Sequence, residues 1–202
     1  MKLLIATGNE GKFLEIQKFL ENIDNLELLS LQDLKISGND LEETGDTFEE
    51  NAFQKAEYFF KKTGIPTLAD DSGIQIDALK GELGVKTRRW GAGENASDQE
   101  WMDFFLNRMK NEKNRNARFF CSICLYFSTN NYHIFSGKSE GQVVQKSSVP
   151  LQKGIPLSSY FVPEGKNEVF SFLTKDEKSE ISHRGRAMKQ VEKFLSHLNS
   201  LL

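Results

Sequence analysis

The sequence predicts an α/β protein in which short apolar strands are followed by amphipathic helices. Lys2 to Ala6 is a short apolar run that ends at Thr7-Gly8-Asn9, and the apolar residues after it recur at helical spacing. Two apolar runs later in the chain, Arg118 to Phe127 and Tyr132 to Ser136, have the composition of strands. A chain of 202 residues is long enough to form one folded domain.

The first half of the chain is predicted to hold two strands and two helices. The first helix is marked by apolar residues at helical spacing, namely Phe13, Ile16, Leu20 and Ile23. Leu26 to Leu31 is predicted to form the second strand. The acidic segment from Ser37 to Asp46 after it shows the apolar periodicity of neither a helix nor a strand. Thr47 and Glu50 form a capping box, which predicts a second helix that ends near Gly64.

A sharp turn is predicted inside the strand region that follows. Pro66 to Asp71 and Ile74 to Leu79 have strand composition, and Asp71-Ser72-Gly73 between them has turn composition. The segment from Gly81 to Gly93 contains four glycines and predicts a loop.

The second half is predicted to begin with a helix and continue as sheet. Ser97 and Glu100 repeat the capping box and predict a third helix. The strands 118–127 and 132–136 are joined at Thr129-Asn130-Asn131 and predict an antiparallel hairpin, to which Gln142 to Gln145 is a candidate third strand. Lys146 to Val162 has no clear period. The apolar face of a terminal helix is formed by Ala187, Met188, Val191, Phe194, Leu195 and Leu198.

The composition argues against two kinds of partner. Lys and Arg total 26 against 29 Asp and Glu, so the net charge of -3 gives no overall attraction to nucleic acid or anionic membranes. The apolar stretch Leu3 to Ala6 is too short for a signal peptide, and no segment approaches the roughly 20 apolar residues of a membrane span. We expect a soluble cytoplasmic protein that binds neither nucleic acid nor membrane.

The two cysteines form a C-x-x-C string, a spacing found in some redox and metal sites. Cys121 and Cys124 lie inside the predicted strand 118–127, where residues three apart point to opposite faces. The chain has no second C-x-x-C and no nearby His in register. We therefore expect two buried core thiols.

The first chemical signal is the loop Thr7-Gly8-Asn9-Glu10-Gly11-Lys12, which follows a strand and opens a helix. Such a loop offers backbone N–H groups, the positive end of a helix dipole and one cation to a phosphate. It is not a P-loop, because only two residues separate Gly8 from Gly11 and Phe13 replaces the Ser or Thr that would hold magnesium. A tight turn with a solvated lysine is the alternative.

The second signal is two pairs of adjacent carboxylates. Glu42 and Glu43 lie in the acidic segment, where acids are commonly just solvated. Asp70 and Asp71 end an apolar strand, so at least one carboxylate would be held rigidly at a sheet edge, a common place for Mg²⁺ ligands. A magnesium ion there would neutralise phosphate charge, and a carboxylate would orient or deprotonate the attacking water.

The third signal is the basic string Ser182-His183-Arg184-Gly185-Arg186-Ala187 at the start of the terminal helix, with Lys178 shortly before it. Basic residues are electrostatically disfavoured at a helix N-terminus. They need either an anionic partner or exposure to solvent, and the sequence leaves both alternatives open.

Together these signals resemble the inosine triphosphate pyrophosphatase family, whose members hydrolyse non-standard purine nucleoside triphosphates. The resemblance rests on four ordered motifs: ATGNEGK at the start, EETGDTFEENAFQKA from Glu42, ADDSGIQIDAL from Ala69 and EISHRGRAMK near the end. It covers nearly the whole chain and implies one domain over residues 1–202. The implied fold is an elongated mixed sheet flanked by helices, with two lobes around a central nucleotide cleft. A Mg²⁺ cofactor and a homodimer are also implied.

The resemblance also implies roles for individual residues. Asp71 would be the general base, and Mg²⁺ would be bound by Asp71 with Glu42 or Glu43. Residues Lys178, His183 and Arg184 would read the purine edge, since all three can donate hydrogen bonds to a 6-keto oxygen. The remaining substrate-binding residues would be Thr7, Gly8, Asn9, Glu10, Gly11, Lys12, Lys55 and Ser72.

Two segments depart from the family pattern. The family carries G-F-G-Y-D-P before a strand that ends in F-V-P, and its Phe stacks on the base while its Asp contacts the purine. Aligned back from Phe161-Val162-Pro163, this chain has Lys153-Gly154-Ile155-Pro156-Leu157-Ser158 instead. Leu83 and Lys86 also stand where the family usually has Pro and Tyr. The phosphate and metal half of the site is predicted to be intact and base recognition to be altered, with Leu157 and Gly154 facing the base.

Three functions follow from these observations. The first is hydrolysis of a triphosphate such as ITP, dITP or XTP to the monophosphate and pyrophosphate. The others are a nucleotide-binding regulatory protein of the same fold with little turnover, and a pyrophosphatase for modified pyrimidine nucleotides. Glu43 and Asp71 together favour an enzyme, because a protein that only binds nucleotides has no need of a metal site.

Overall fold

The computed structural model describes residues 1–38, 41–87, 90–93 and 95–199, and these form one six-stranded sheet and five α-helices. The sheet order is β2-β1-β3-β4-β5-β6. The strands are β1 (Lys2–Ile5), β2 (Glu27–Ser30), β3 (Thr67–Ile76), β4 (Asn116–Ser128), β5 (Asn131–Val143) and β6 (Phe161–Pro163). Strand β1 pairs in parallel with β2 and β3, and the other pairs are antiparallel. The predicted α/β class with a mixed sheet is confirmed.

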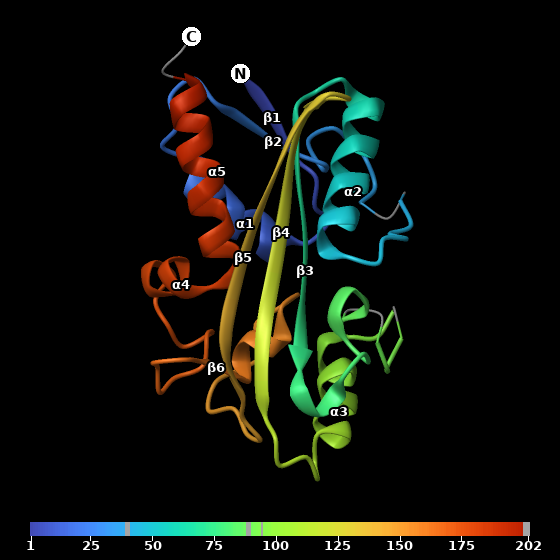
Figure 1. Ribbon diagram of the computed structural model, residues 1–202, viewed down its shortest axis with the longest axis vertical. Helices are drawn as coiled ribbons and strands as arrows, with labels where there is room; N and C mark the ends of the chain where they lie inside the picture. Colours follow the sequence, from blue (N-terminus) through green and yellow to red (C-terminus); the bar gives the residue numbers. More distant parts are fainter. Residues whose placement is uncertain (39–40, 88–89, 94, 200–202) are drawn as a thin grey trace.

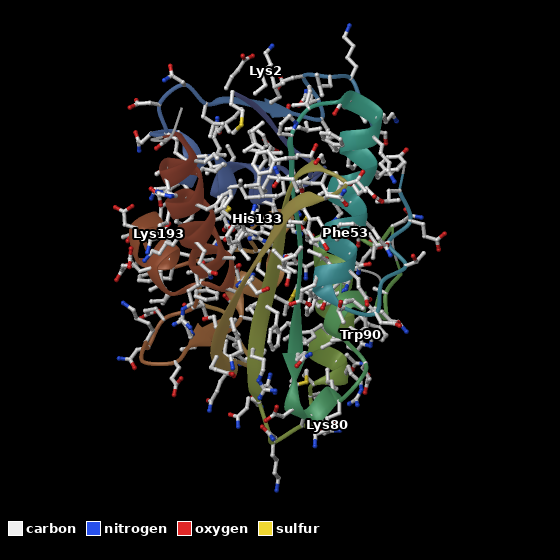
Figure 2. All side chains as sticks on the ribbon, turned by 45° about the horizontal axis from the view of Figure 1, so that its top comes forward. Lys2, Phe53, Lys80, Trp90, His133 and Lys193 are labelled. Carbon is white, nitrogen blue, oxygen red and sulfur yellow. The ribbon has the colours of Figure 1, made fainter. Side chains whose placement is uncertain are left out.

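The helices lie on both faces of this elongated sheet. Helix α2 (Phe48–Thr63) lies on one side of the long strands, and α1 (Glu10–Leu20) and α5 (His183–Asn199) lie on the other (Figure 1). Helix α3 (Asp98–Arg108) lies beside the far end of the strands, and the short α4 (Lys175–Ile181) precedes α5. Lys2 and Lys80 mark opposite ends of the molecule (Figure 2). In the part of the chain described, no helix has the length and apolarity to cross a bilayer.

The predicted caps and core thiols are confirmed. Thr47 with Glu50, and Ser97 with Glu100, form capping boxes at the starts of α2 and α3. Cys121 packs in the apolar cluster beneath α1 and α5, whereas Cys124 packs in the cluster beneath α2. Both thiols are free and buried, and burial raises the pKa of each to about 12.

The predicted sharp turn at Asp71-Ser72-Gly73 is wrong, because β3 runs through these residues and pairs with β4 from Thr67 to Ile76. Gly73 serves close packing instead of a turn. A Cβ added there would lie 2.4 Å from the carbonyl oxygen of Gly84. The strand predicted to reach Leu79 ends at Ile76, where a short 3₁₀ helix, Asp77–Leu79, begins.

The strand predicted over Tyr132 to Ser136 and the first two residues of the one predicted over Gln142 to Gln145 belong to a single strand, β5, which ends at Val143 and pairs with β4 up to Gln142. Gly137 interrupts the apolar pattern because α5 packs on the strand there, and an added Cβ would lie 2.1 Å from the carbonyl oxygen of His183. The unassigned segment 146–162 contains a 3₁₀ helix, Pro156–Ser159, and the start of β6. Residues 39–40 of the predicted acidic segment, and Arg88 and Arg89 of the glycine-containing loop, lie outside the described residues.

Candidate active site

The candidate site lies where β3 extends past the end of β1. One edge of β3 pairs with β4 along its whole length, and the opposite edge pairs with β1 only at Thr67 and Leu68. In the described chain, this second edge therefore has no neighbouring strand from Ala69 onward. Side chains alternate between the faces of a strand. Asp70 therefore points to the face covered by α1 and α5, and Asp71 points to the face covered by α2.

Asp70 is the centre of a buried cluster of charges. Its Oδ2 lies 3.1 Å from Nζ of Lys12 and 3.3 Å from Nη2 of Arg184, and its side chain is fully buried. Burial by itself raises the pKa of this carboxyl, but Lys12 and Arg184 outweigh it and hold the pKa well below its usual range. Asp70 is thus an anion that holds two cations together.

Glu15 on α1 is a second anion of this cluster and was not among the predicted site residues. Its carboxylate is ion-paired with Arg184 and lies 2.6 Å from Nζ of Lys178. Burial favours a higher pKa for this carboxyl, but Arg184 and Lys178 outweigh it and lower the pKa to about 2. The i, i+3 spacing from Lys12, which places both residues on one side of α1, is the sequence signal that pointed to Glu15.

The basic residues at the start of α5 show both arrangements that the sequence left open, an anionic partner for one arginine and exposure to solvent for another. Arg184 is buried and has internal anionic partners, Glu15 and Asp70, and its Nη2 also donates to Oγ of Ser72 at 3.0 Å. Arg186, by contrast, is exposed. Solvation therefore explains Arg186, and charge pairing within the protein explains Arg184.

His183 is buried and stacks on Phe119, with ring centroids 4.7 Å apart. Burial, and then the positive charge of Arg184, hold the pKa of His183 well below its usual value. The imidazole is neutral at pH 7 and has one donor and one acceptor nitrogen. Among the described residues, its Nδ1 has no hydrogen-bond partner.

Asp71 is held by two hydrogen bonds on the side of the sheet facing α2. Its Oδ2 accepts from Nδ2 of Asn51 at 3.0 Å, and its Oδ1 accepts from the backbone N–H of Ser72 at 2.8 Å. Burial raises the pKa of the Asp71 carboxyl, and the nearby Lys12 and Lys55 do not fully offset this effect. A raised pKa makes the ionised carboxylate a stronger base than an ordinary Asp.

Asn51 is a further site residue that was not predicted from the sequence. Its side chain is fully buried, and its Oδ1 accepts from the backbone N–H of Gly45 at 2.7 Å while its Nδ2 donates to Asp71. One amide thereby fixes the acidic segment relative to β3. A polar residue on the inward face of α2, beside the buried Ala52, was the available signal.

Lys55 connects the acidic segment to the same edge. Its Nζ is ion-paired with Glu43 and donates to the carbonyl oxygen of Asp70 at 3.0 Å. Burial lowers the pKa of Lys55, but Glu43, Asp70 and Asp71 together raise it above its usual value. Of the two predicted alternative metal ligands, Glu43 is thus ion-paired with Lys55, whereas Glu42 is exposed.

In the described residues, no three His, Cys, Asp or Glu side chains are grouped closely enough to hold a metal ion.

The predicted phosphate loop is ordered by its own side chains. Asn9 caps α1, since its Oδ1 accepts from the backbone N–H of Lys12 at 3.1 Å, and Oγ1 of Thr7 accepts from the N–H of Asn9 at 3.2 Å. Gly8 packs closely on Gly38, where an added Cβ would lie 3.0 Å from Cα of Gly8. Glu10 is exposed and lies 3.6 Å from Lys153. The loop thus brings Lys12, but not Glu10, to the carboxylates of β3.

The interpretation that Leu157 faces the base is wrong. The 3₁₀ helix at Pro156–Ser159 turns this side chain inward, and Leu157 is only 5% exposed within the core cluster that includes Phe161. Gly154 instead packs against Asn9, since an added Cβ would lie 3.0 Å from Oδ1 of Asn9. The family's aromatic and acidic residues are absent, but Leu157 does not take their place.

A hollow of about 580 Å³ lies on the α2 side of the sheet, between the start of α2 and residues 83–85. It reaches Ser122, which pairs with Asp71 in the β3–β4 register, and Ser136. Lys12, Asp71 and Arg184 do not line it. The candidate site is therefore defined by the charged groups at the β3 edge and not by this hollow.

Fold and site together define an α/β protein that gathers lysines, an arginine and carboxylates at one edge of a mixed sheet. Arginine and lysine side chains beside a helix N-terminus suit a phosphorylated ligand. Residues 3–194 match the Ham1 family. The chain therefore belongs to the Ham1 family.

Individual relatives are similar to this chain over nearly their whole length. A dITP/XTP pyrophosphatase of Flavobacterium psychrophilum is 37% identical over 98% of this chain and 100% of its own. Another from Vibrio parahaemolyticus is 38% identical over 96% of each chain. The solved structure of a HAM1 protein from Coxiella burnetii has a TM-score of 0.83 and 32% identity, and covers 98% of this chain and 99% of its own.

Replacing Glu15 with Gln is expected to lower the free energy of unfolding at neutral pH and to have much less effect in acid. The pKa of Glu15 is about 2 in the folded protein against an ordinary 4.5, so its charge stabilises the fold above pH 4.5. This contribution is lost as the pH falls toward 2 and amounts to roughly 3 kcal/mol at pH 7. Urea unfolding at a series of pH values measures it.

Glu10→Gln is the matched control, because the carboxylate of Glu10 is 76% exposed. Little change is expected for this variant at any pH. The difference between wild type and Glu15→Gln should fall to less than half by about pH 3. A difference that stays constant from pH 7 to pH 3 would show that the charge of Glu15 does not stabilise the fold.

Proposed function

We propose that this chain is a nucleoside-triphosphate pyrophosphatase that hydrolyses non-standard purine triphosphates such as dITP, ITP and XTP to the monophosphate and pyrophosphate. The observation that carries the proposal is the meeting of Lys12 and Lys55, from two different helices, at the Asp70-Asp71 edge of β3. The names of the relatives, dITP/XTP pyrophosphatases matched over nearly their whole length, support the same substrates.

The triphosphate is held by Lys12 and Lys55, by the backbone N–H groups at the start of α1, and by Thr7 and Asn9. Lys12 and Lys55 are both largely shielded from solvent, with side chains 17% and 15% exposed, so their attraction for phosphate is weakly screened. Both are ion-paired with carboxylates, and the triphosphate shares these cations. Ser72 contacts the nucleotide at the same edge.

Mg²⁺ is the cofactor that we propose, held by Asp71 with Glu43. Carboxylate oxygens are the ligands that magnesium prefers. Three carboxylates, those of Glu43, Asp70 and Asp71, lie close enough to Lys55 to raise its pKa. The carboxylates of Asp71 and Glu43 would supply the protein oxygens, and the phosphates of the nucleotide would supply the others. Glu42 is the alternative ligand to Glu43. When bound, the ion neutralises charge on the phosphate oxygens.

Asp71 is the proposed general base. Its carboxylate accepts a proton from the attacking water, which adds to the α-phosphorus as the bond to the oxygen bridging the α- and β-phosphorus breaks. Asn51 and the N–H of Ser72 hold the carboxylate in place. Lys12 and Lys55 stabilise the charge that develops on the leaving pyrophosphate.

Lys178, His183 and Arg184 are proposed to recognise the 6-keto edge of the purine. Arg184 is fixed by Glu15, Asp70 and Ser72, so its position does not depend on the ligand. The opposite side of the base lacks the family's stacking and acidic residues. We also propose, from the resemblance alone, a homodimer in the cytoplasm, and light scattering tests the oligomeric state.

Pyrophosphate release across a panel of ITP, XTP, GTP, ATP and pyrimidine triphosphates tests the function. ITP and XTP should be hydrolysed to monophosphate and pyrophosphate, with a preference of only about 10- to 200-fold over the other bases, because the acidic residue with which the family contacts the purine is absent. Diphosphate and orthophosphate as products would contradict the reaction. Tight binding without turnover would indicate the regulatory protein, and a preference for modified pyrimidines would indicate the other pyrophosphatase.

A further inference from the structure

Asp98 begins a chain of hydrogen bonds that ends at the proposed phosphate site. Its Oδ2 accepts from the backbone N–H of Gly154 at 2.7 Å, and the carbonyl oxygen of Gly154 accepts from Nδ2 of Asn9 at 2.9 Å. The Oδ1 of Asn9 in turn accepts from the backbone N–H of Lys12 at 3.1 Å. Three hydrogen bonds thus connect the start of α3 to the start of α1 through one peptide segment.

The segment at the centre of this chain has little room to move. Gly154 has φ +76°, a conformation that favours glycine, and an added Cβ would meet the side-chain amide of Asn9 at 3.0 to 3.2 Å. A Cβ added to Gly11 would lie 3.4 Å from the carbonyl oxygen of Lys153. The backbone of residues 153–154 therefore packs directly on the phosphate loop.

Asp98 is not needed to cap its own helix. Ser97 and Glu100 already form the capping box of α3, in which Oγ of Ser97 accepts from the N–H of Glu100 at 3.2 Å. The carboxylate of Asp98 is thus available to the distant Gly154, 56 residues along the chain. A side chain from one helix that meets a backbone amide beside the site is a means of fixing a loop in position.

We propose that Asp98 is a positioning residue for the pyrophosphatase site, acting through Gly154 on Asn9 and the start of α1. The inference rests on the proposed function and adds a residue outside the four motifs. Asp98 touches neither substrate nor metal. It holds the backbone of residues 153–154 against the phosphate loop, and hence fixes the position of Asn9 and the start of α1 that hold the triphosphate.

Asp98→Ala removes the acceptor of the Gly154 N–H and should lower kcat/KM for ITP by roughly 10- to 100-fold, since small displacements of positioning groups have effects of this size. Asp98→Asn keeps an acceptor oxygen and should restore most of the activity. Gln99→Ala is the matched control, because Gln99 is exposed and the hydrogen bond described for its side chain stays within α3, to Asp103. It should behave as wild type.

A double-mutant cycle with Asn9→Ser separates positioning from general destabilisation. Serine still caps a helix but cannot donate to the carbonyl of Gly154. If the hydrogen bonds from Asp98 through Gly154 to Asn9 act as a unit, the double variant Asp98→Ala with Asn9→Ser should have a kcat/KM no lower than that of the less active single variant. Independent effects on kcat/KM would instead multiply. Multiplied effects, failure of Asn to rescue, or a wild-type rate for Asp98→Ala would overturn the proposal.

Two further measurements keep the outcome clear. Urea unfolding identifies any variant that is not folded. If Asp98→Ala does not fold, Asp98→Asn takes its place in the cycle, and the loss of kcat/KM that it causes should disappear in the Asn9→Ser background. A loss of the same factor in both backgrounds would contradict the proposal. If the wild type releases no pyrophosphate from any triphosphate, the proposed function fails. Calorimetric affinities for ITP in the same variants then test Asp98, with the same non-additivity expected and multiplied effects again contradicting it.

Discussion

Replacing Asp71 with Asn is expected to lower kcat by about 10²- to 10⁴-fold while leaving the fold intact. The amide has the shape of the carboxylate but is a poor base and a weaker metal ligand. The fold should tolerate the change, because burial raises the pKa of Asp71, which means that the folded protein disfavours its charge. One of its two accepted hydrogen bonds is lost, at a cost of about 1 kcal/mol.

Single-turnover kinetics at saturating Mg²⁺, together with urea unfolding, measure both parts of this expectation. Asp103→Asn is the matched control, since Asp103 is exposed on α3 and its only described contact is with Gln99. This variant should keep wild-type activity. An Asp71→Asn enzyme with more than roughly half of the wild-type kcat would exclude Asp71 as the base.

The helices and the α/β class were predictable because their signals are local. Capping boxes lie within four residues, and the apolar stripe of α2 lies within one helix. The turn at Asp71-Ser72-Gly73 was predicted wrongly because its composition is that of a turn. What makes it a strand is distant in sequence: β4 pairs with it, and Oγ1 of Thr87 accepts from the N–H of Ile74 at 3.1 Å.

The site residues divide in the same way. Lys12, Asp71 and Arg184 lie in short motifs, and the structure brings them to one edge of β3. Asn51 and Glu15 were missed, because each has meaning only through partners on other elements. The position of Leu157 was predicted wrongly for a related reason. Its side chain packs in a core cluster that includes residues of α3 and β6, and the residues next to Leu157 in the sequence give no sign of these contacts.

Asp70 and Asp71 are adjacent but have opposite electrostatic surroundings. Asp70 faces Lys12 and Arg184, which lower its pKa despite burial, whereas burial dominates at Asp71 and raises its pKa. In the fold, one carboxylate is thus favoured as an ion and the other is disfavoured. The favoured ion serves structure, and the disfavoured one is suited to accept a proton. The two substitutions to Asn should therefore act on different properties.

Asp70→Asn is expected to lower the free energy of unfolding by about 3 to 5 kcal/mol, because it removes one partner from a buried ion-pair cluster. The carboxylate of Asp70 is 0% exposed, and its loss removes the ion pair described for Lys12 and one of the two described for Arg184, which keeps Glu15. Since the pKa of Asp70 is lowered in the fold, its charge stabilises the protein throughout the neutral range. Urea unfolding at pH 7 measures the loss.

Asp77→Asn supplies the comparison, because Asp77 follows β3 directly and pairs with Arg118 at 2.8 Å, with side chains 26% and 30% exposed. An ion pair so open to solvent contributes about 1 kcal/mol or less. Asp70→Asn should therefore unfold at a clearly lower urea concentration than Asp77→Asn, with a similar dependence on urea. Equal losses in the two variants would mean that the cluster of Asp70, Lys12 and Arg184 is no more stabilising than a surface ion pair.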